Sequence, residues 1–138
     1  GIHFECEAGY LFITLPSGRK LAYFQPELRP EPQYDKVGLT YMGKGQSGKY
    51  TRQKTYGGKL VENITQATAR DCLRDAMTAL DAAGYRVVFH VHDELIADMP
   101  FGKGSLAEMC EIMGRPLPWA PGLPLRAEGD ELPFYMKT

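Results

Sequence analysis

The spacing of apolar residues predicts two short strands between residues 85 and 99. Val87, Phe89 and Val91 occupy alternate positions, and the alternation resumes after residue 94. Period two over such runs is typical of half-buried strands. The pair Asp93 and Glu94 separates the two runs, so we expect it at or beside the bend of a hairpin. A carboxylate on a stiff strand junction is held more rigidly than one on a long loop, which favours metal-assisted chemistry.

A solvated turn is the alternative interpretation of the triplet His92, Asp93 and Glu94. Asp is common in turns because its side chain bonds the local backbone, and a three-residue motif occurs by chance. The apolar strands on both sides of the triplet, together with a helix upstream, favour the functional interpretation.

Residues 59–83 have the apolar spacing of the longest helix in the sequence, and Gly84 is a natural stop at its end. The apolar positions approximate a 3.6-residue stripe. They are Leu60, Ile64, Ala67, Cys72, Ala76, Leu80 and Ala83.

A second row of the same helix carries hydrogen-bond donors and no carboxylate. Lys59, Asn63, Gln66 and Arg70 are spaced four, three and four residues apart, so they line one face. Donors in a line suit the minor groove, where purine N3 and pyrimidine O2 accept at every base pair. The alternative is the ordinary polar face of a surface helix. The neighbouring charges are expected to be solvated: Glu62, Asp71, Arg74 and Asp75.

The first part of the chain is expected to form two hairpins. Strands over 10–15 and 19–24 flank a turn at 16–18, and the proline-containing segment 25–34 is expected to be extended and not helical. A second, basic hairpin is predicted from strands at 38–42 and 49–55 around the flexible loop 43–48.

After the hairpin at 85–99, a turn leads into a helix over 106–113. Ser105 is its predicted cap, with Glu108 at the third helical position. Two short closing strands are predicted at 123–127 and 132–136, and Trp119 is expected to be a packing anchor rather than a stacking platform for a base.

The predicted fold class is therefore α+β: an antiparallel sheet with one long helix, a basic N-terminal hairpin region and a short C-terminal helix. The boundary is expected after residue 58, so that 1–58 form the hairpin region and 59–138 carry the acidic hairpin.

Charge is unevenly distributed, although the net charge is only −1. Between Lys36 and Leu60 there are six basic residues and no acidic one, whereas from Val61 onward acids outnumber bases by twelve to seven. The net charge argues neither for nor against a nucleic-acid partner, but a basic segment followed by an acidic remainder is an asymmetry that needs an explanation.

Residues 43–49 match the pattern G-x-x-x-x-G-K of phosphate-binding loops. Tyr50 stands where that motif has Ser or Thr, and residues 50–56 have the composition of a strand rather than of the required helix. A nucleotide-binding domain using this loop is thus the weakest functional hypothesis.

The three cysteines are far apart and fit a reducing compartment, and no apolar run is long enough for a membrane span. We expect a cytoplasmic protein that does not contact a membrane. The opening Gly1-Ile2-His3 indicates a piece of a longer protein.

The residues Tyr56 to Asp71 and Val91 to Leu95 resemble the C-terminal palm portion of family A DNA polymerases, particularly the phage type. The predicted hairpin from Gly9 to Leu21 is similar to one that these enzymes carry just before that helix. The three features occur in the family's order, and the resemblance covers essentially the whole chain.

The resemblance implies roles for single residues. Asp93 would be one of the two carboxylates that ligate catalytic magnesium, Glu94 an adjacent acidic support, and His92 would lie near the primer terminus. Gln66 and Asn63 would touch the minor groove, and Arg19 would contact nucleic acid. With the helix donors Lys59 and Arg70, these are the predicted DNA-binding residues.

The implied activity is template-directed nucleotidyl transfer by a two-metal mechanism, with Mg²⁺, primer–template DNA and deoxynucleoside triphosphates. The family's first motif, the fingers helix and the thumb are absent from this sequence, so the chain alone is expected to be inactive. The expected location is the bacterial cytoplasm, with a phage or prophage origin. The alternative is a non-catalytic nucleic-acid-binding module.

Overall fold

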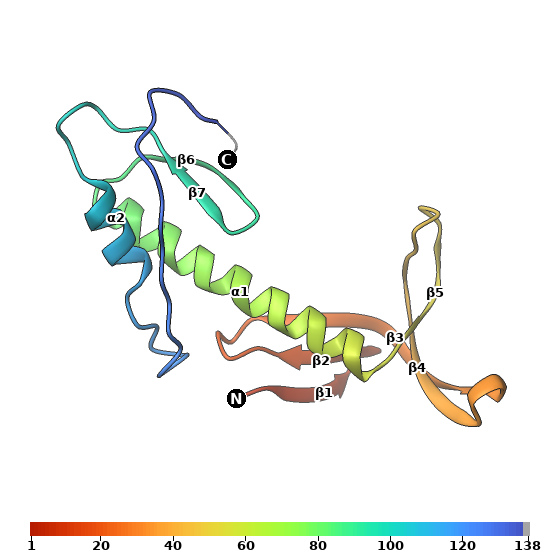
Figure 1. Cartoon of the computed structure of the whole chain (residues 1–138). Coiled ribbons are helices and arrows are strands. Elements are labelled where there is room, and N and C mark those ends of the chain that lie inside the picture. Colours follow the sequence, from red (N-terminus) through yellow and green to blue (C-terminus); the bar gives the residue numbers. More distant parts are fainter. Residues whose placement is uncertain (137–138) are drawn as a thin grey trace. The chain divides into compact units, whose positions relative to one another are not determined.

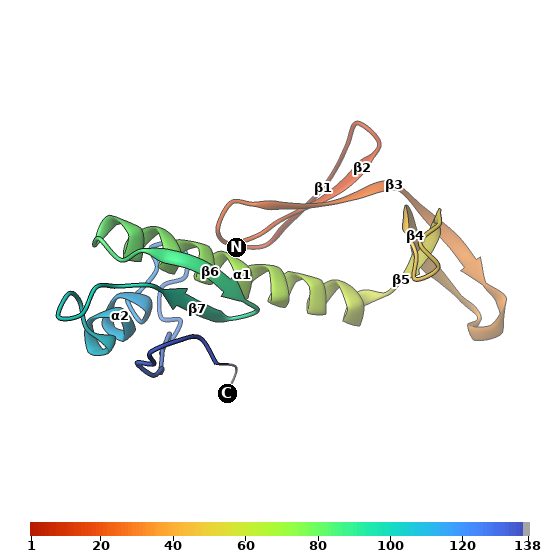
Figure 2. The same ribbon diagram turned by 90° about the horizontal axis from the view of Figure 1, so that it is seen from above.

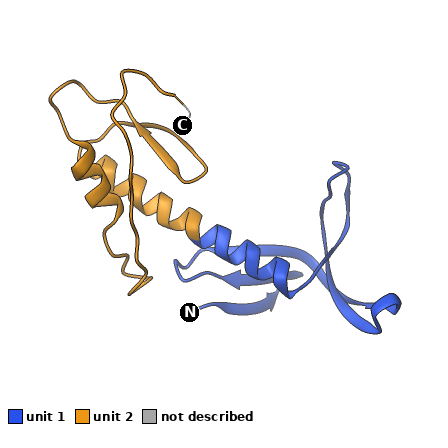
Figure 3. Cartoon of the chain, viewed as in Figure 1, with its two compact units in different colours: residues 1–68 blue, residues 69–138 orange. Residues whose placement is uncertain are grey.

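The structure is a computed structural model that describes residues 1–136, and the chain divides into two compact units, 1–68 and 69–138 (Figure 3). Both units contain part of one long helix, α1 (Gly57–Ala82). The predicted α+β class is confirmed, because a five-stranded antiparallel sheet, a two-stranded sheet, the long helix and a short C-terminal helix are all present. The proposed domain boundary after residue 58 stays a prediction.

The sheet of unit 1 follows the order of the sequence (Figure 1). Each strand pairs antiparallel with the next. In Figure 2, the long strand β3 runs from the β1–β2 pair to the β4–β5 pair, so it joins two hairpins. The strands are β1 (His3–Glu7), β2 (Tyr10–Thr14), β3 (Lys20–Glu31), β4 (Lys36–Lys44) and β5 (Tyr50–Thr55).

Strand β1 was not predicted from the sequence. It pairs with β2 through a two-residue turn in which Ala8 and Gly9 both have positive φ, +49° and +81°. Two positive φ values are the mark of the type I′ turn, whose twist matches that of the flanking strands. The turn is unusual in placing Ala at the first of these positions, and this hid it from the sequence pattern.

The segment 25–34 differs in part from the expectation. It is extended as predicted up to Glu31, but as the second half of β3, which continues past a bulge between Phe24 and Glu27. Pro32–Tyr34 then form a short 3₁₀ helix, so the prediction that this segment is not helical is wrong for these three residues. Proline is compatible with the first position of a helical turn, where its missing N–H has no partner to lose.

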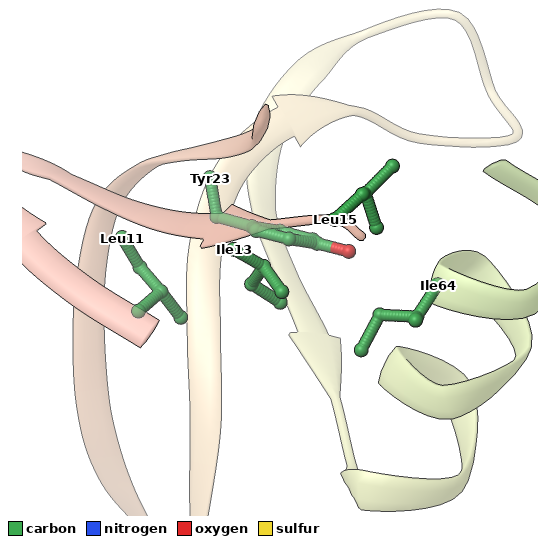
Figure 4. Close-up of a cluster of buried hydrophobic side chains, with 5 residues drawn as sticks. All are labelled: Leu11, Ile13, Leu15, Tyr23 and Ile64. Carbon is green, nitrogen blue, oxygen red and sulfur yellow. The ribbon is translucent and has the colours of Figure 1, made fainter. Parts of the chain in front are cut away.

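The core of unit 1 lies between β2, β3 and the start of α1. Leu11, Ile13 and Leu15 occupy alternate positions of β2 and the residue that follows it, and they are buried together with Tyr23 and with Ile64 from the helix (Figure 4). Burial of this apolar stripe fixes the first half of α1 against the sheet, because each such side chain contributes about 1.5–3 kcal/mol when removed from water.

Unit 2 contains the second half of α1, the hairpin β6 (Val87–Val91) and β7 (Glu94–Ala97), and α2 (Leu106–Met113). Its core cluster is Leu80, Tyr85 and Ile112. The predicted stop of α1 is confirmed: Gly84 has φ +88°, its N–H bonds to Asp81, and the next N–H, of Tyr85, bonds back to Leu80. This is the Schellman arrangement, which favours glycine at that position.

The predicted cap of α2 is confirmed, because the Ser105 side chain accepts from the Glu108 N–H at 3.2 Å. The Glu108 carboxylate does not return to the Ser105 backbone as a capping box requires. It accepts from the Tyr85 hydroxyl instead, and the Ser105 N–H donates to the same hydroxyl at 3.0 Å. The hydrogen bond to Glu108 raises the pKa of Tyr85.

The two closing strands predicted at 123–127 and 132–136 are wrong, because the chain is irregular over both ranges. Pro124 and Pro133 each lie inside one of them and remove a backbone donor that a strand ladder needs. Within residues 1–136, no helix is both long and apolar enough to cross a lipid bilayer.

Candidate functional site

The β6–β7 hairpin places the acidic pair at the bend, as the sequence predicted. Val91 pairs with Glu94, so His92 and Asp93 are the two central residues of the turn. His92 has φ +52°, a left-handed conformation that is uncommon for residues other than glycine. A two-residue turn between paired strands leaves the Asp93 backbone little freedom.

The side chains of this turn are exposed to solvent. His92, Asp93 and Glu94 are all exposed, and across residues 1–136 none of the three makes a side-chain hydrogen bond or an ion pair. An arginine beside Asp93 would have neutralised it and left no room for a cation, but none is paired with it. The carboxylates are therefore available to a ligand from outside.

Magnesium is held mainly by carboxylate and water oxygens, which suits Asp93 as one ligand and Glu94 as its neighbour. Within residues 1–136, however, no three His, Cys, Asp or Glu side chains lie close enough to hold a metal ion together. The donor chemistry fits magnesium, and the ligand set is partial.

In unit 1 the predicted donor row on α1 is engaged in contacts within the chain. The Lys59 ammonium lies 2.9 Å from Glu62, and the Gln66 amide donates to the same carboxylate at 3.2 Å. Glu62 is exposed, as predicted, and it also serves as the acceptor for these two donors. The hydrogen bond from Lys59 to Glu62 also raises the pKa of Lys59.

Asn63 contacts a residue that the sequence did not single out. Its amide donates to the Tyr23 hydroxyl on β3 at 2.9 Å, which ties the helix to the sheet. Tyr23 occurs in an alternating strand pattern that marks it only as a core residue, so no sequence signal indicated this bond. The amide oxygen of Asn63 is not used by this bond.

The cation predicted on the first hairpin also contacts the helix. Arg19 follows the turn between β2 and β3, and its guanidinium donates to the Ala67 carbonyl at 2.9 Å. This hydrogen bond joins the hairpin to α1, although the Arg19 side chain is exposed. Contact between Arg19 and nucleic acid stays a prediction.

In unit 2, Arg70 contacts His90 of β6. The two guanidinium nitrogens lie 2.9 Å and 3.3 Å from the ring nitrogens Nε2 and Nδ1. Since Arg70 has only donors, a ring nitrogen of His90 accepts in this contact. This contact turns the fourth member of the donor row toward the strand that leads to Asp93.

Two of the carboxylates expected to be solvated are packed into unit 2. Asp71 is only 2 % exposed and lies 3.8 Å from Arg74, so the prediction for Asp71 is wrong. Asp75 accepts from the Trp119 indole at 2.6 Å and from Arg74 at 2.7 Å. Burial raises the pKa of Asp75, but the bonds from Trp119 and Arg74 outweigh it and leave the pKa below its usual value. The bond to Asp75 agrees with a structural role for Trp119.

The loop that matches the phosphate-binding pattern joins two strands. Lys44 at the end of β4 pairs with Tyr50 at the start of β5, and no helix follows the loop. A phosphate loop needs the N–H groups of a helix start to face the anion. The hypothesis of a nucleotide-binding domain built on residues 43–49 is therefore wrong.

Comparison with known proteins gives one strong similarity. The chain is 54 % identical, over 137 residues, to a DNA polymerase of Bacillus phage SP02. No family model and no solved structure matches the chain. The match covers 99 % of this chain and 21 % of the phage protein, so the chain spans about a fifth of the length of that relative. Over nearly all of its own length, the chain thus corresponds to one region of a phage DNA polymerase.

Proposed function

We propose that this chain is the part of a DNA polymerase that supplies one metal-binding carboxylate, Asp93, to a two-metal nucleotidyl-transfer centre. One observation carries the proposal: an exposed carboxylate on a two-residue turn, paired with no side chain of residues 1–136, in a chain that matches a region of a phage DNA polymerase almost from end to end. The substrates would be primer–template DNA and deoxynucleoside triphosphates, and the bacterial cytoplasm would be the place of action.

When bound, a pair of magnesium ions about 3.5–4 Å apart stabilises the attacking and leaving oxygens of an in-line displacement at phosphorus. The protein's own contribution is to position and to neutralise. Asp93 would hold the metal from its fixed place on the turn, and Glu94, at the start of β7, would add negative charge beside it.

The DNA would be held by the remaining candidates. Gln66 and Asn63 each give an amide nitrogen to a protein acceptor and keep an amide oxygen, while Lys59 and Arg70 supply positive charge along the same helix. His92 at the turn and Arg19 after the first hairpin would complete the contacts to primer and template. Because the helix residues and Arg19 have partners in the chain, binding of DNA would exchange those partners for base edges and phosphates.

The chain alone would be inactive, because Asp93 and Glu94 provide only part of a two-metal ligand set. The 138-residue chain is expected to give no nucleotide incorporation in a primer-extension assay with Mg²⁺. Measurable incorporation by it would contradict this part of the proposal.

The decisive test places this chain in the phage SP02 polymerase in exchange for the region that it matches. In the chimera, Asp93→Asn should reduce kcat by about 10²–10³-fold, the usual cost of removing one strong electrostatic contact to a transition state. The affinity for primer–template should be unchanged. Asp98→Asn is the matched control, since Asp98 is exposed and forms a surface ion pair with Arg86. Its activity should stay within twofold of the parent, about the effect of a surface ion pair.

The same experiment separates catalysis from simple binding. If Asp93→Asn leaves kcat intact, or if it lowers DNA affinity instead of turnover, the catalytic role is refuted and the alternative, a nucleic-acid-binding module, is supported.

A further inference from the structure

The β4–β5 hairpin of unit 1 has two unlike faces. Cross-strand partners lie on the same face of an antiparallel pair, and here the pairs Thr40–Lys54, Met42–Arg52 and Lys44–Tyr50 share one. The opposite face includes Leu39 and Tyr41, which pack against the core of unit 1. Lys44, Arg52 and Lys54 therefore lie on the face turned away from that core, and Lys49 lies in the loop that joins the two strands.

Three lysines of this hairpin have no counter-charge. Lys44, Lys49 and Lys54 are exposed, and no side chain within residues 1–136 forms an ion pair or hydrogen bond with them. Of the other lysines in unit 1, Lys20 pairs with Glu5 and Lys59 with Glu62, and the Lys36 ammonium lies over the Tyr34 ring, 5.1 Å from its centroid. We call Lys44, Lys49 and Lys54 the lysine arm.

The fourth basic residue of the hairpin has a different task. Arg52 donates to the Gln25 carbonyl at 3.0 Å and to the Thr40 hydroxyl at 3.1 Å, and it lies 3.4 Å from Glu27. These contacts fix the hairpin to β3 at its base. The lysine arm is thus held on an anchored support, while its own charges stay open to a partner. The tip of the hairpin stands clear of the rest of unit 1 (Figure 1).

We propose that the lysine arm binds the phosphate backbone of duplex DNA, without reading its sequence. The choice of DNA as the partner rests on the proposed polymerase function, and the need for an anionic partner rests on the unpaired charges. Lysine is a point charge on a flexible stem and binds phosphate without the planar geometry that specific recognition uses.

The dimensions of the hairpin suit a regular row of phosphates. A strand rises about 3.4 Å per residue, and the phosphates of one DNA strand are spaced by about 3.4 Å along the helix axis. Lys44 lies opposite Tyr50 and Lys54 lies four residues beyond it, so the two lysines stand about 14 Å apart along the hairpin. A hairpin lying along the duplex would therefore span about four phosphates of one strand.

The salt dependence of binding tests this directly. Each phosphate contact adds about 0.9 to the slope of log affinity against log salt concentration. For the 138-residue chain and a primer–template duplex, the change of all three lysines to Gln (K44Q, K49Q and K54Q together) should lower the slope by up to about 2.7. Between 50 and 200 mM NaCl, the parent should then lose up to about 40-fold more affinity than the variant.

The matched control removes the same charge elsewhere: K36Q, K103Q and R126Q together, all exposed positions outside the lysine arm. Its slope should equal that of the parent. Changing the arm lysines to Arg should restore the parent slope, and that variant also guards against a folding defect, as does the circular dichroism of every variant. Equal slopes for the parent and the Gln variant would overturn the proposal. A control variant whose slope is as low as that of the Gln variant would overturn it too.

Other anionic partners are distinguished in the same series. Binding of the parent to vesicles of phosphatidylserine and phosphatidylcholine, without binding to the duplex, would also refute the proposal. In the SP02 chimera, the Gln variant should raise the KM for DNA and leave kcat unchanged at saturating DNA. Asp93→Asn should instead lower kcat and leave the affinity for DNA unchanged. Failure of the lysine arm and failure of the polymerase function therefore give different results.

Discussion

The two hairpins that end in charged side chains are built in contrasting ways. The β6–β7 hairpin has strands of five and four residues and a two-residue turn, and it presents carboxylates. The β4–β5 hairpin has strands of nine and six residues with residues 45–49 as its loop, and it presents lysines. The tight turn fixes the place of a single group, whereas the long loop spreads charge over a wide surface.

The difference follows from how sharply each interaction depends on distance. A metal ligand must lie within about 0.2 Å of its ideal position. The attraction of a lysine to a phosphate acts over a Debye length, about 10 Å at 0.1 M salt. A carboxylate that binds a metal therefore requires a rigid backbone, whereas a lysine that contacts phosphate tolerates a flexible one. Both hairpins match the task proposed for them.

The largest expected difference between the two hairpins comes from inserting one glycine into each of them. A glycine inserted between Asp93 and Glu94 shifts the carboxylate by more than 1 Å, and in the SP02 chimera we expect kcat to fall by about 10²-fold or more. A glycine inserted between Gly45 and Gln46 lengthens an already open loop, and kcat should stay within about twofold, since exposed loops tolerate insertions well. Steady-state primer extension measures both.

Equal effects of the two insertions would show that the precision assigned to the β6–β7 turn is not used. A third insertion, between Gly102 and Lys103 in an exposed turn, controls for nonspecific disturbance of unit 2. It should behave like the insertion at Gly45.

The next prediction compares the contacts at the bases of the hairpins. Arg52 has a side chain only 20 % exposed and bonds to two oxygen acceptors, so Arg52→Ala should lower the free energy of unfolding by about 1.5–3 kcal/mol. Arg86 pairs with Asp98 at 3.0 Å, but both side chains are mostly exposed. Arg86→Ala should cost about 0–1 kcal/mol. Urea denaturation of the chain checks the difference, and an equal cost would contradict it.

The pH dependence of the Arg52 effect has a definite sign. The hydrogen bond from Arg29 is the main cause that lowers the pKa of Glu27, and the charge of Arg52 lowers it further. A carboxyl with a lowered pKa stabilises the fold above its unfolded pKa, about 4.3 for Glu, and this contribution is lost as the pH falls through the folded pKa. Part of the unfolding free energy lost in Arg52→Ala comes from the pairing of Arg52 with Glu27. This part should vanish once the pH falls below the folded pKa of Glu27.

Much of this architecture could be predicted from local pattern. The α1 helix with its glycine stop, the capped α2, the strand after the glycine-rich loop and the bend at Asp93 all follow from residues within one turn or strand of each other. In these places propensity, periodicity and turn chemistry agree.

The errors have both distant and local causes. Strand β1, in which polar and apolar residues alternate, is held by its pairing with β2, whereas residues 123–127 remain irregular because Pro124 removes a ladder donor. Asp71 has the composition of a surface residue, yet it is packed in unit 2. For the donor row, the spacing along the helix correctly predicted that its members share one face. It could not predict that Lys59 and Gln66 donate to Glu62, because that choice depends on side-chain rotamers.

The smallest expected effect tests how the β6–β7 turn is held. His92 is in a left-handed conformation, φ +52°, which costs a residue with a Cβ about 1–2 kcal/mol and glycine much less. After the loss of chain entropy that glycine brings, His92→Gly should stabilise the chain by about 0.5–1 kcal/mol. Asp93 does not have positive φ, so Asp93→Gly is the matched control and should destabilise the chain by about 0.5–1 kcal/mol. Urea denaturation gives both signs. Destabilisation by His92→Gly would mean that the imidazole itself holds the turn, and that the rigidity assigned to the backbone belongs to a side chain.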